Sequence, residues 1–355
     1  MSSEVVQNSR AQSMEYHYNE IMRIYNEMTP VVTTPSGGMG RSTTLPPPLS
    51  EDEVSMEQGE VVVSIPILVQ LAKERTPCGW EEVFQRCEGI LSLISTNLAQ
   101  YSKWYPEPEN IFNAFHLTPL YKVKVVIVGQ DPYPQGQAVG LSFSVRRGDS
   151  IPVSLANVFK EVKNNYPSIL LNHGDLTSWA LQGVLLLNRC LTVSPGSPGS
   201  HSGVGWMAFV NIIVKAIIEA NPRVIFILWG NDAKQLCSLL PENVKRLTAA
   251  HPSGYSANRG FFGCGHFKEV NRILTEQHRS YLSRLLSYWT SLRPGLSYQA
   301  QKWTQQIEST LFSEVRNELS SLEKDETVPQ DGDLRVSMET WLVAAEYEMI
   351  NWSLT

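Results

Sequence analysis

Two short polar motifs each follow an apolar run of the kind that forms a buried strand. Gly129-Gln130-Asp131-Pro132-Tyr133 comes after the run at 123–128, and His251-Pro252-Ser253 comes after the run at 247–250. The carboxyl ends of strands in an α/β sheet open into the crevice where ligands bind, so both motifs are expected at one cleft. A carboxylate there can hold a water molecule or stabilise a cation, and a histidine can donate a hydrogen bond to a developing anion. The two motifs therefore predict a catalytic site.

Four apolar runs and the helices between them must position these motifs. The runs lie at 123–128, 184–187, 224–228 and 247–250, and helical periodicity is found at 67–73, 80–97, 155–164, 206–220 and 268–276. Buried strands that alternate with helices at this spacing indicate a parallel sheet covered on both faces. We therefore expect an α/β fold, a three-layer α/β/α sandwich with a central four-stranded, mainly parallel sheet.

Several segments resemble the family 1 uracil-DNA glycosylases, and they occur in the family's order. The family's water-activating motif reads Gly-Gln-Asp-Pro-Tyr-His and its DNA-intercalating motif reads His-Pro-Ser-Pro-Leu-Ser, to which residues 129–133 and 251–253 are similar. Further matching segments lie at 154–161, 175–188, 200–206, 228–230 and 259–264. The resemblance covers about 60% of the chain, residues 66–278. It implies an enzyme that flips deoxyuridine out of DNA, hydrolyses its N-glycosidic bond and leaves an abasic site for base excision repair.

The resemblance assigns the chemistry to Asp131 and His251. Cleavage of the glycosidic bond develops positive charge on the sugar and negative charge on the departing uracil. Asp131 is expected to hold the attacking water and stabilise the sugar cation, and His251 to donate a hydrogen bond to the uracil O2. The alternative is a purely structural role for each residue. Asp131 would then be a turn or helix-capping aspartate, and His251 a surface histidine whose hydrogen bonds are already satisfied. No lysine occupies a motif position, which argues against a strand-cleaving lyase because such an enzyme usually needs an amine nucleophile.

The resemblance also assigns the uracil pocket. Asn188 matches the amide that reads the uracil edge, and Tyr133 matches the ring that excludes the thymine methyl group. Phe143 matches the aromatic residue that stacks on the base, and Gln130 is expected to line the pocket through its backbone. A strand-end Asn is otherwise commonly a turn residue, and the two aromatic residues are otherwise ordinary core side chains.

Small hydroxyl side chains suit contacts to a deformed DNA backbone. The serines that match the family's phosphate contacts are Ser154, Ser200, Ser253 and Ser256. Arg259 is expected to add a further phosphate contact. Any one serine alone is better explained by turn chemistry, so the prediction depends on their joint placement beside the two motifs.

Two motif positions depart from the family. Pro134 replaces the His that ends the first motif, and Gly254-Tyr255 replaces Pro-Leu in the second. Tyr255 therefore stands at the wedge position, where an aromatic ring can still fill the gap left by a flipped base. We expect activity to survive both changes, with an altered efficiency and an altered balance between single-stranded and double-stranded substrates.

Composition places limits on the protein class. The 355 residues are 42% hydrophobic, which suits one large domain with appendages. The net charge is −6, but residues 66–278 carry 19 basic and 15 acidic side chains, and phosphate binding depends on a local basic patch. Five cysteines show no Cys-x-x-Cys pair, which disfavours a zinc site or an iron–sulfur cluster. We therefore expect reduced thiols and no metal or nucleotide cofactor.

The two ends of the chain lie outside the resemblance. Residues 1–65 are rich in proline and acidic residues and are expected to form a mostly disordered arm, with one segment at 16–28 that either forms a transient helix or docks on a protein surface. Residues 66–278 are the expected catalytic domain. Helical spacing at 282–292 and 303–319 predicts a helical insertion at 279–345 before a C-terminal strap at 346–355. The insertion either packs on the core or binds a replication or repair protein.

The expected partner is uracil-containing DNA, single- or double-stranded, and a monomer is favoured. No apolar run approaches 18 residues and Met1-Ser2-Ser3-Glu4 begins no secretory signal, so we expect a soluble intracellular protein with no membrane partner, and a nuclear location is compatible. One alternative is a non-catalytic DNA-binding or replication scaffold, against which Asp131, Asn188 and His251 weigh. Another is a mismatch-type glycosylase, but those resemble a Gly-Ile-Asn-Pro start that lacks the carboxylate of Asp131.

Overall fold

The computed structural model describes residues 66–292 and 349–354, without the side chains at 279 and 281–292. These residues belong to one compact unit. The predicted arm at 1–65, with its helical segment at 16–28, lies outside the described residues. So does the predicted insertion from residue 293 onward, including its second helical segment.

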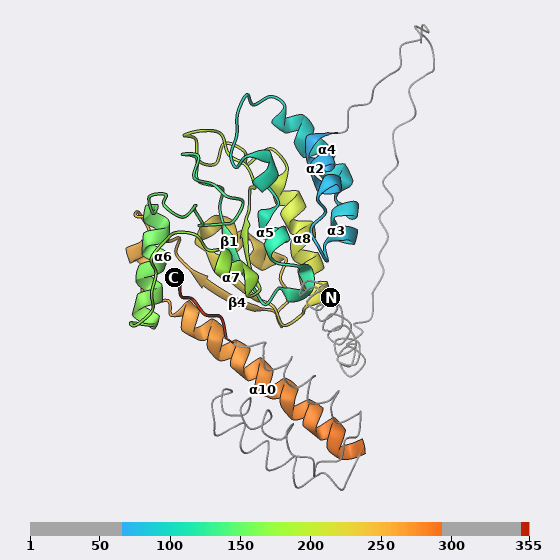
Figure 1. Cartoon of the computed structure of the whole chain (residues 1–355), viewed down its shortest axis with the longest axis vertical. Helices are drawn as coiled ribbons and strands as arrows, with labels where there is room; N and C mark the ends of the chain where they lie inside the picture. The colour runs from blue at the N-terminus through green and yellow to red at the C-terminus, as the bar shows by residue number, and fades with distance from the viewer. Residues whose placement is uncertain (1–65, 293–348, 355) are drawn as a thin grey trace, which may run out of the picture. The chain divides into compact units, whose positions relative to one another are not determined.

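Four parallel strands form the central sheet in the order β2-β1-β3-β4 (Figure 1). They are β1 (Val125–Gly129), β2 (Val184–Asn188), β3 (Ile225–Trp229) and β4 (Lys245–Ala249). Every residue of β1, β2 and β3 is buried, as expected for strands covered on both faces. The predicted four-stranded sheet is therefore confirmed, and all four strands are parallel.

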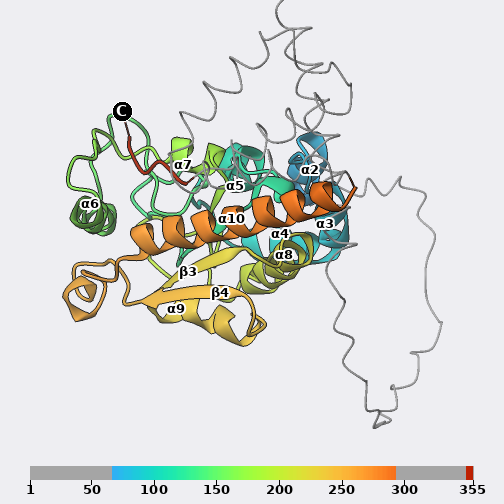
Figure 2. The same ribbon diagram turned by 90° about the horizontal axis from the view of Figure 1, so that it is seen from below.

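Helices cover both faces of the sheet. Figures 1 and 2 show α3 (Glu81–Arg86), α4 (Glu88–Leu98) and α8 (Trp206–Ala220) grouped on one side of the strands, with α6 (Val153–Asn165) on the other. The long α10 (His266–Leu292) packs against α6. The other α-helices of the described residues are α2 (Ile67–Glu74), α5 (Asn113–Leu117), α7 (Thr177–Leu181) and α9 (Gly230–Lys234). The predicted α/β/α sandwich is confirmed.

Helix boundaries follow the sequence prediction where an apolar stripe decides them. Helix α8 spans the predicted 206–220 because its buried positions recur with helical spacing. The helical segment predicted at 80–97 forms two helices, because α3 and α4 meet at Cys87, whose N–H is shared between the carbonyls of Val83 and Phe84. The apolar periodicity continues through this break, so the sequence pattern does not reveal it.

The loop that leads into α10 is held by a buried carboxylate. Glu161 on α6 is fully buried and accepts the N–H groups of Gly263 at 2.8 Å and Gly265 at 3.0 Å. Burial favours the neutral acid, but these hydrogen bonds, with those from Asn165 and Asn164, hold the pKa of Glu161 below its usual value. Helix α10 therefore begins at His266, two residues before the predicted start.

The C-terminal strap returns to the core beside α10. Ile350, Trp352 and Leu354 are buried, and the Trp352 ring packs edge-on against Trp179 and Phe267, with ring centroids 5.0 and 4.9 Å apart. Asn271 on α10 forms two hydrogen bonds with the backbone of Ile350. Its Oδ1 accepts the Ile350 N–H at 2.9 Å, and its Nδ2 donates to the Ile350 carbonyl at 3.1 Å. The chain thus leaves the core through α10 and rejoins it at this helix.

Candidate active site

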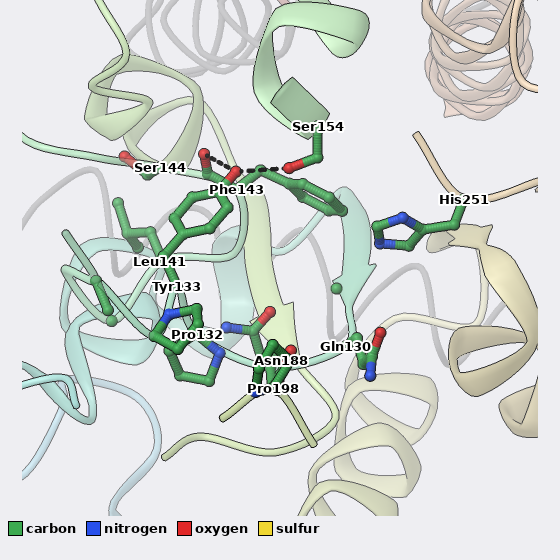
Figure 3. Close-up of a pocket in the computed structure, with 15 residues that line it drawn as sticks. Gln130, Pro132, Tyr133, Leu141, Phe143, Ser144, Ser154, Asn188, Pro198 and His251 are labelled. Atoms are coloured by element: carbon green, nitrogen blue, oxygen red, sulfur yellow. Dashed lines mark hydrogen bonds between the residues drawn. The ribbon is translucent and has the colours of Figure 1, made fainter. Parts of the chain in front are cut away.

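A small pocket opens where β1 and β2 end. Its cavity of about 180 Å³ is below the roughly 300 Å³ at which pockets for drug-sized ligands begin, so it suits a single small ring. All six residues predicted for catalysis and base recognition line it: Gln130, Asp131, Tyr133, Phe143, Asn188 and His251. Figure 3 shows five of them by label, with Ser154 above and Pro198 below. Segments separated by up to 121 residues therefore meet at one site.

Asp131 lies two residues beyond the end of β1, in a loop rather than at a helix terminus. Its Oδ2 accepts the backbone N–H of Gly199 at 2.5 Å, which ties the carboxylate to a loop 68 residues away. Burial raises the pKa of Asp131, and nearby Asp232 raises it further, while the Gly199 hydrogen bond opposes both. The carboxylate is thus oriented and partly shielded from water, as a group acting on a developing cation must be.

His251 follows β4 and presents a defined ring nitrogen. Its Nδ1 accepts the backbone N–H of Ser253 at 3.0 Å, so this nitrogen carries no proton in that bond. Burial lowers the pKa of His251, although Asp232 opposes this shift, so the ring is neutral at pH 7. A neutral ring with Nδ1 as acceptor carries its proton on Nε2, which makes Nε2 a hydrogen-bond donor.

Two glycines make room for the site's polar side chains. Gly129 pairs in register with Asn188, and a Cβ atom at Gly129 would stand only 2.3 Å from Asn188 Oδ1. Gly230 has a φ of +85°, and a Cβ there would lie 2.9 Å from the Cβ of His251. Asn188 itself is 6% exposed at the end of β2. Sequence reasoning did not single out these glycines, although a glycine at the end of a strand signals close backbone approach.

Phe143 and Tyr133 form an aromatic wall. Phe143 has a φ of +63°, an uncommon backbone conformation for a bulky residue, and its ring lies 5.5 Å from Trp229 and 5.9 Å from His251. The Tyr133 hydroxyl contacts the Phe143 carbonyl oxygen at 3.2 Å and Ser154 Oγ at 3.0 Å, as the dashed lines in Figure 3 mark. Burial raises the pKa of Tyr133 to about 12, so the phenol stays neutral.

Of the predicted DNA contacts, Ser154 lines the pocket and the others do not. Ser253 Oγ and Ser256 Oγ are 2.8 Å apart, and Ser256 Oγ donates to the carbonyl of His251 at 2.8 Å. Between these serines the Tyr255 side chain is 93% exposed. The predicted phosphate contacts at Ser200 and Arg259 also lie outside the pocket lining, and Arg259 is exposed.

A loop that sequence reasoning did not assign to the pocket closes one side of it. Pro198 lines the cavity, and Gly199 binds Asp131. The loop is fixed by His201, which is 1% exposed and whose two ring nitrogens lie 2.8 Å from Thr192 Oγ1 and 2.9 Å from Ser194 Oγ. The sequence signal for this loop was the repeated Pro-Gly pair at 195–199. Such a pair predicts a turn, but it does not reveal that the turn contacts Asp131.

Comparison with known proteins identifies the family. Residues 115–275 match the Uracil DNA glycosylase superfamily. A uracil-DNA glycosylase of Chlamydia trachomatis is 44% identical over 220 residues, which are 59% of this chain and 95% of the relative. The chain belongs to the uracil-DNA glycosylase family. A second relative, from Proteus mirabilis, is 45% identical over 217 residues, 58% of this chain and 95% of the relative.

Solved structures agree with this membership. The crystal structure of mimivirus uracil-DNA glycosylase superposes with a TM-score of 0.55 at 29% identity, covering 59% of this chain and 86% of that one. The predicted activity is therefore confirmed: the enzyme is a monofunctional DNA glycosylase that removes uracil from DNA. The alternative of a non-catalytic DNA-binding or replication scaffold is therefore rejected for the protein as a whole.

Among residues 66–292 and 349–354, no group of three or more His, Cys, Asp or Glu side chains is arranged to hold a metal ion. In that part of the chain no helix combines the length and the apolar character needed to cross a bilayer.

Proposed function

We propose that this uracil-DNA glycosylase uses Asp131 and His251 as its catalytic pair. The observation that carries the proposal is their convergence on one small pocket with Asn188, Tyr133 and Phe143. Asn188 is the last residue of β2, and Asp131 and His251 each lie two residues beyond the end of a parallel strand, where α/β enzymes bind their ligands.

Asp131 acts on the sugar and on the attacking water. Its Oδ2 is held by Gly199, which leaves Oδ1 to orient a water molecule toward C1′. As the glycosidic bond lengthens, positive charge grows on the sugar, and the ionised carboxylate stabilises it in a site that is largely shielded from water. That cation also favours ionised Asp131, which counters the effect of burial on its pKa.

His251 acts on the departing base. With Nδ1 accepting from Ser253, the Nε2–H of the neutral ring donates to the uracil O2, where negative charge develops. Because the donor is fixed before the reaction, it needs no reorganisation as the charge appears. By comparison with the loss of one oxyanion-hole donor, removing this group is expected to cost about 3 kcal/mol in the barrier.

Recognition of uracil is proposed for the opposite wall. The Asn188 amide donates to O4 and accepts from N3–H, whereas cytosine presents the reverse pattern and leaves both amide groups unpaired. The Tyr133 ring stands against C5 and excludes the thymine methyl group. Phe143 stacks on the base, and Gln130 borders the pocket through its backbone.

Contacts with the DNA backbone are proposed for the rim. Ser154 lies in the first turn of α6, a helix of 13 residues with no side-chain cap, so its leading N–H groups are available to a phosphate. Ser200, Ser253, Ser256 and Arg259 add contacts around the same opening. The exposed Tyr255 acts as the wedge that replaces a flipped base, which makes both single-stranded and double-stranded DNA substrates.

The division of the chain into an arm at 1–65, a catalytic domain at 66–278, an insertion at 279–345 and a strap at 346–355 is part of the proposal. The double hydrogen bond between Asn271 and Ile350 supports it, because the chain leaves and re-enters the core at one place. We propose that the arm or the insertion binds a replication or repair protein and that the enzyme acts as a monomer.

Cleavage of defined oligonucleotides tests the catalytic assignment. The full chain is incubated with single-stranded U, U:A, U:G and T:A substrates, and abasic sites are revealed with alkali. We expect cleavage of the three uracil substrates, none of T:A, and loss of activity in Asp131→Asn and His251→Leu. The control is Asp149→Asn, a carboxylate outside the pocket lining. Wild-type activity in both catalytic variants would reject the proposed pair.

A further inference from the structure

The hydroxyl group of Ser154 is already engaged on the inner side of the pocket. It lies 3.0 Å from the phenolic oxygen of Tyr133, which in turn lies 3.2 Å from the carbonyl oxygen of Phe143 (Figure 3). A carbonyl oxygen can only accept, so Tyr133 donates its single hydroxyl proton to Phe143. The proton between Ser154 and Tyr133 must then come from Ser154. The three groups form a chain in which Ser154 donates to Tyr133 and Tyr133 donates to Phe143.

This direction leaves Ser154 with no proton for DNA. A phosphate oxygen accepts hydrogen bonds, so a phosphate contact through Ser154 Oγ requires the proton that Tyr133 now receives. Tyr133 can restore the balance by turning its own proton from the Phe143 carbonyl toward Ser154 Oγ. The reversal rotates the O–H bonds of Tyr133 and Ser154 and requires no heavy atom to move.

We propose, on the basis of the Ser154 phosphate contact proposed above, that this chain of hydrogen bonds reverses when DNA binds. Ser154 then donates to a phosphate oxygen, Tyr133 donates to Ser154, and the Phe143 carbonyl is released. Each hydroxyl keeps its own proton and no covalent bond changes. Tyr133 thereby becomes a positioning residue for the DNA backbone, although its ring faces the base pocket.

The reversal links the binding of the DNA phosphate by Ser154 to the position of the Phe143 ring against the base. Donation from Tyr133 polarises the Ser154 hydroxyl and strengthens its bond to a charged phosphate. The released carbonyl belongs to Phe143, which is held at a φ of +63° and whose ring is proposed to stack on uracil. Without the bond from Tyr133, Phe143 is free to adjust to the flipped base. Phosphate binding and pocket closure are thus coupled through one serine.

An oligonucleotide with a stable abasic-site analogue isolates this role of Tyr133, because it offers the phosphates but no base for the ring to touch. Its affinity for the full chain is measured by fluorescence anisotropy for wild type, Ser154→Ala, Tyr133→Phe and the double variant. We expect Ser154→Ala to weaken binding about tenfold, as for the loss of a hydrogen bond to a charged group. Tyr133→Phe should weaken it about threefold through the lost polarisation. The double variant should bind no more weakly than Ser154→Ala, because both changes break the same chain.

Ser200 provides the matched control. Its Oγ accepts the backbone N–H of Ser194 at 2.9 Å, which leaves its own proton available for a phosphate. Tyr133→Phe should therefore weaken binding by the same factor in a Ser200→Ala background as in the wild type. Ser154→Thr keeps a hydroxyl group and should restore binding, and thermal melting establishes that each variant is folded.

The outcomes separate the two proposals. If Ser154→Ala weakens binding but Tyr133→Phe does not, or if Tyr133→Phe has the same effect with and without Ser154, the reversal is overturned and the phosphate contact stands. If Ser154→Ala leaves binding of the abasic oligonucleotide unchanged, both are overturned.

Discussion

Gly129→Ala should disable uracil recognition without unfolding the protein. The new Cβ would stand 2.3 Å from Asn188 Oδ1 and 3.0 Å from the Cβ of Ser142, and Cβ atoms essentially never approach another heavy atom closer than 3.0 Å. The Asn188 amide must therefore withdraw by at least about 0.7 Å. A displacement of about 1 Å in a positioned group can cost about 100-fold in rate, which equals about 2.7 kcal/mol.

The backbone tolerates this substitution. Gly129 does not have a positive φ, so alanine meets no conformational penalty there, and overpacking at one buried position costs about 1–3 kcal/mol of stability. The matched control is Gly89→Ala near the start of α4, where a Cβ meets nothing within 4 Å. That variant should keep full activity and gain about 0.5–1 kcal/mol of stability.

The assay is kcat/KM on a single-stranded uracil oligonucleotide, with thermal melting to establish folding. We expect Gly129→Ala to lower kcat/KM about 100-fold. Because the loss acts through Asn188, adding Gly129→Ala to Asn188→Ala should cost nothing more. Activity within threefold of wild type in a folded Gly129→Ala protein would refute the reasoning, and so would a full further loss in the double variant.

Three further predictions follow from the same geometry. Gly230→Ala places a Cβ atom 2.9 Å from His251 in a backbone with a φ of +85°. The variant should lower kcat at least about tenfold in the oligonucleotide assay, because the His251 ring is displaced. An unchanged kcat would show that His251 tolerates the displacement. Asp131→Asn should raise the melting temperature more at pH 8 than at pH 4. Burial raises the pKa of Asp131 in the folded protein, so ionisation of this carboxyl group destabilises the fold as the pH rises through that pKa. An equal rise in melting temperature at both pH values would contradict this. Trp352→Ala should cost about 3–5 kcal/mol in urea unfolding, because the ring is 1% exposed against Trp179 and Phe267, and a cost below about 1 kcal/mol would show that the strap adds little stability.

The sheet was predictable because its strands are nearly pure apolar runs. Burial on both faces demands such runs, and β1, β2 and β3 lie within two residues of the predicted bounds. The edge strand β4 begins two residues before its predicted start because Lys245 and Arg246 are polar and partly exposed. The break at Cys87 was missed for a different reason: a helix can be interrupted by one residue's backbone while the apolar stripe continues across it.

The sequence alone determined which groups are available for chemistry. A carboxylate, an amide and an imidazole each follow an apolar run, and the segments that carry them resemble one glycosylase family. Comparison with known proteins confirms that the chain belongs to this family. Their roles as catalytic and base-reading residues remain predictions. Residue type and local periodicity carry this information because burial, strand ends and helix stripes are properties of short segments.

Only the tertiary structure decided how these groups are held. The Gly199 N–H that orients Asp131, the space at Gly129 that admits Asn188, and the chain from Ser154 through Tyr133 to Phe143 join segments separated by 10 to 68 residues. Burial also moves the pKa of Asp131 up and that of His251 down. Distances across the fold and the exclusion of water set these properties, and neither is encoded in a local pattern of residues.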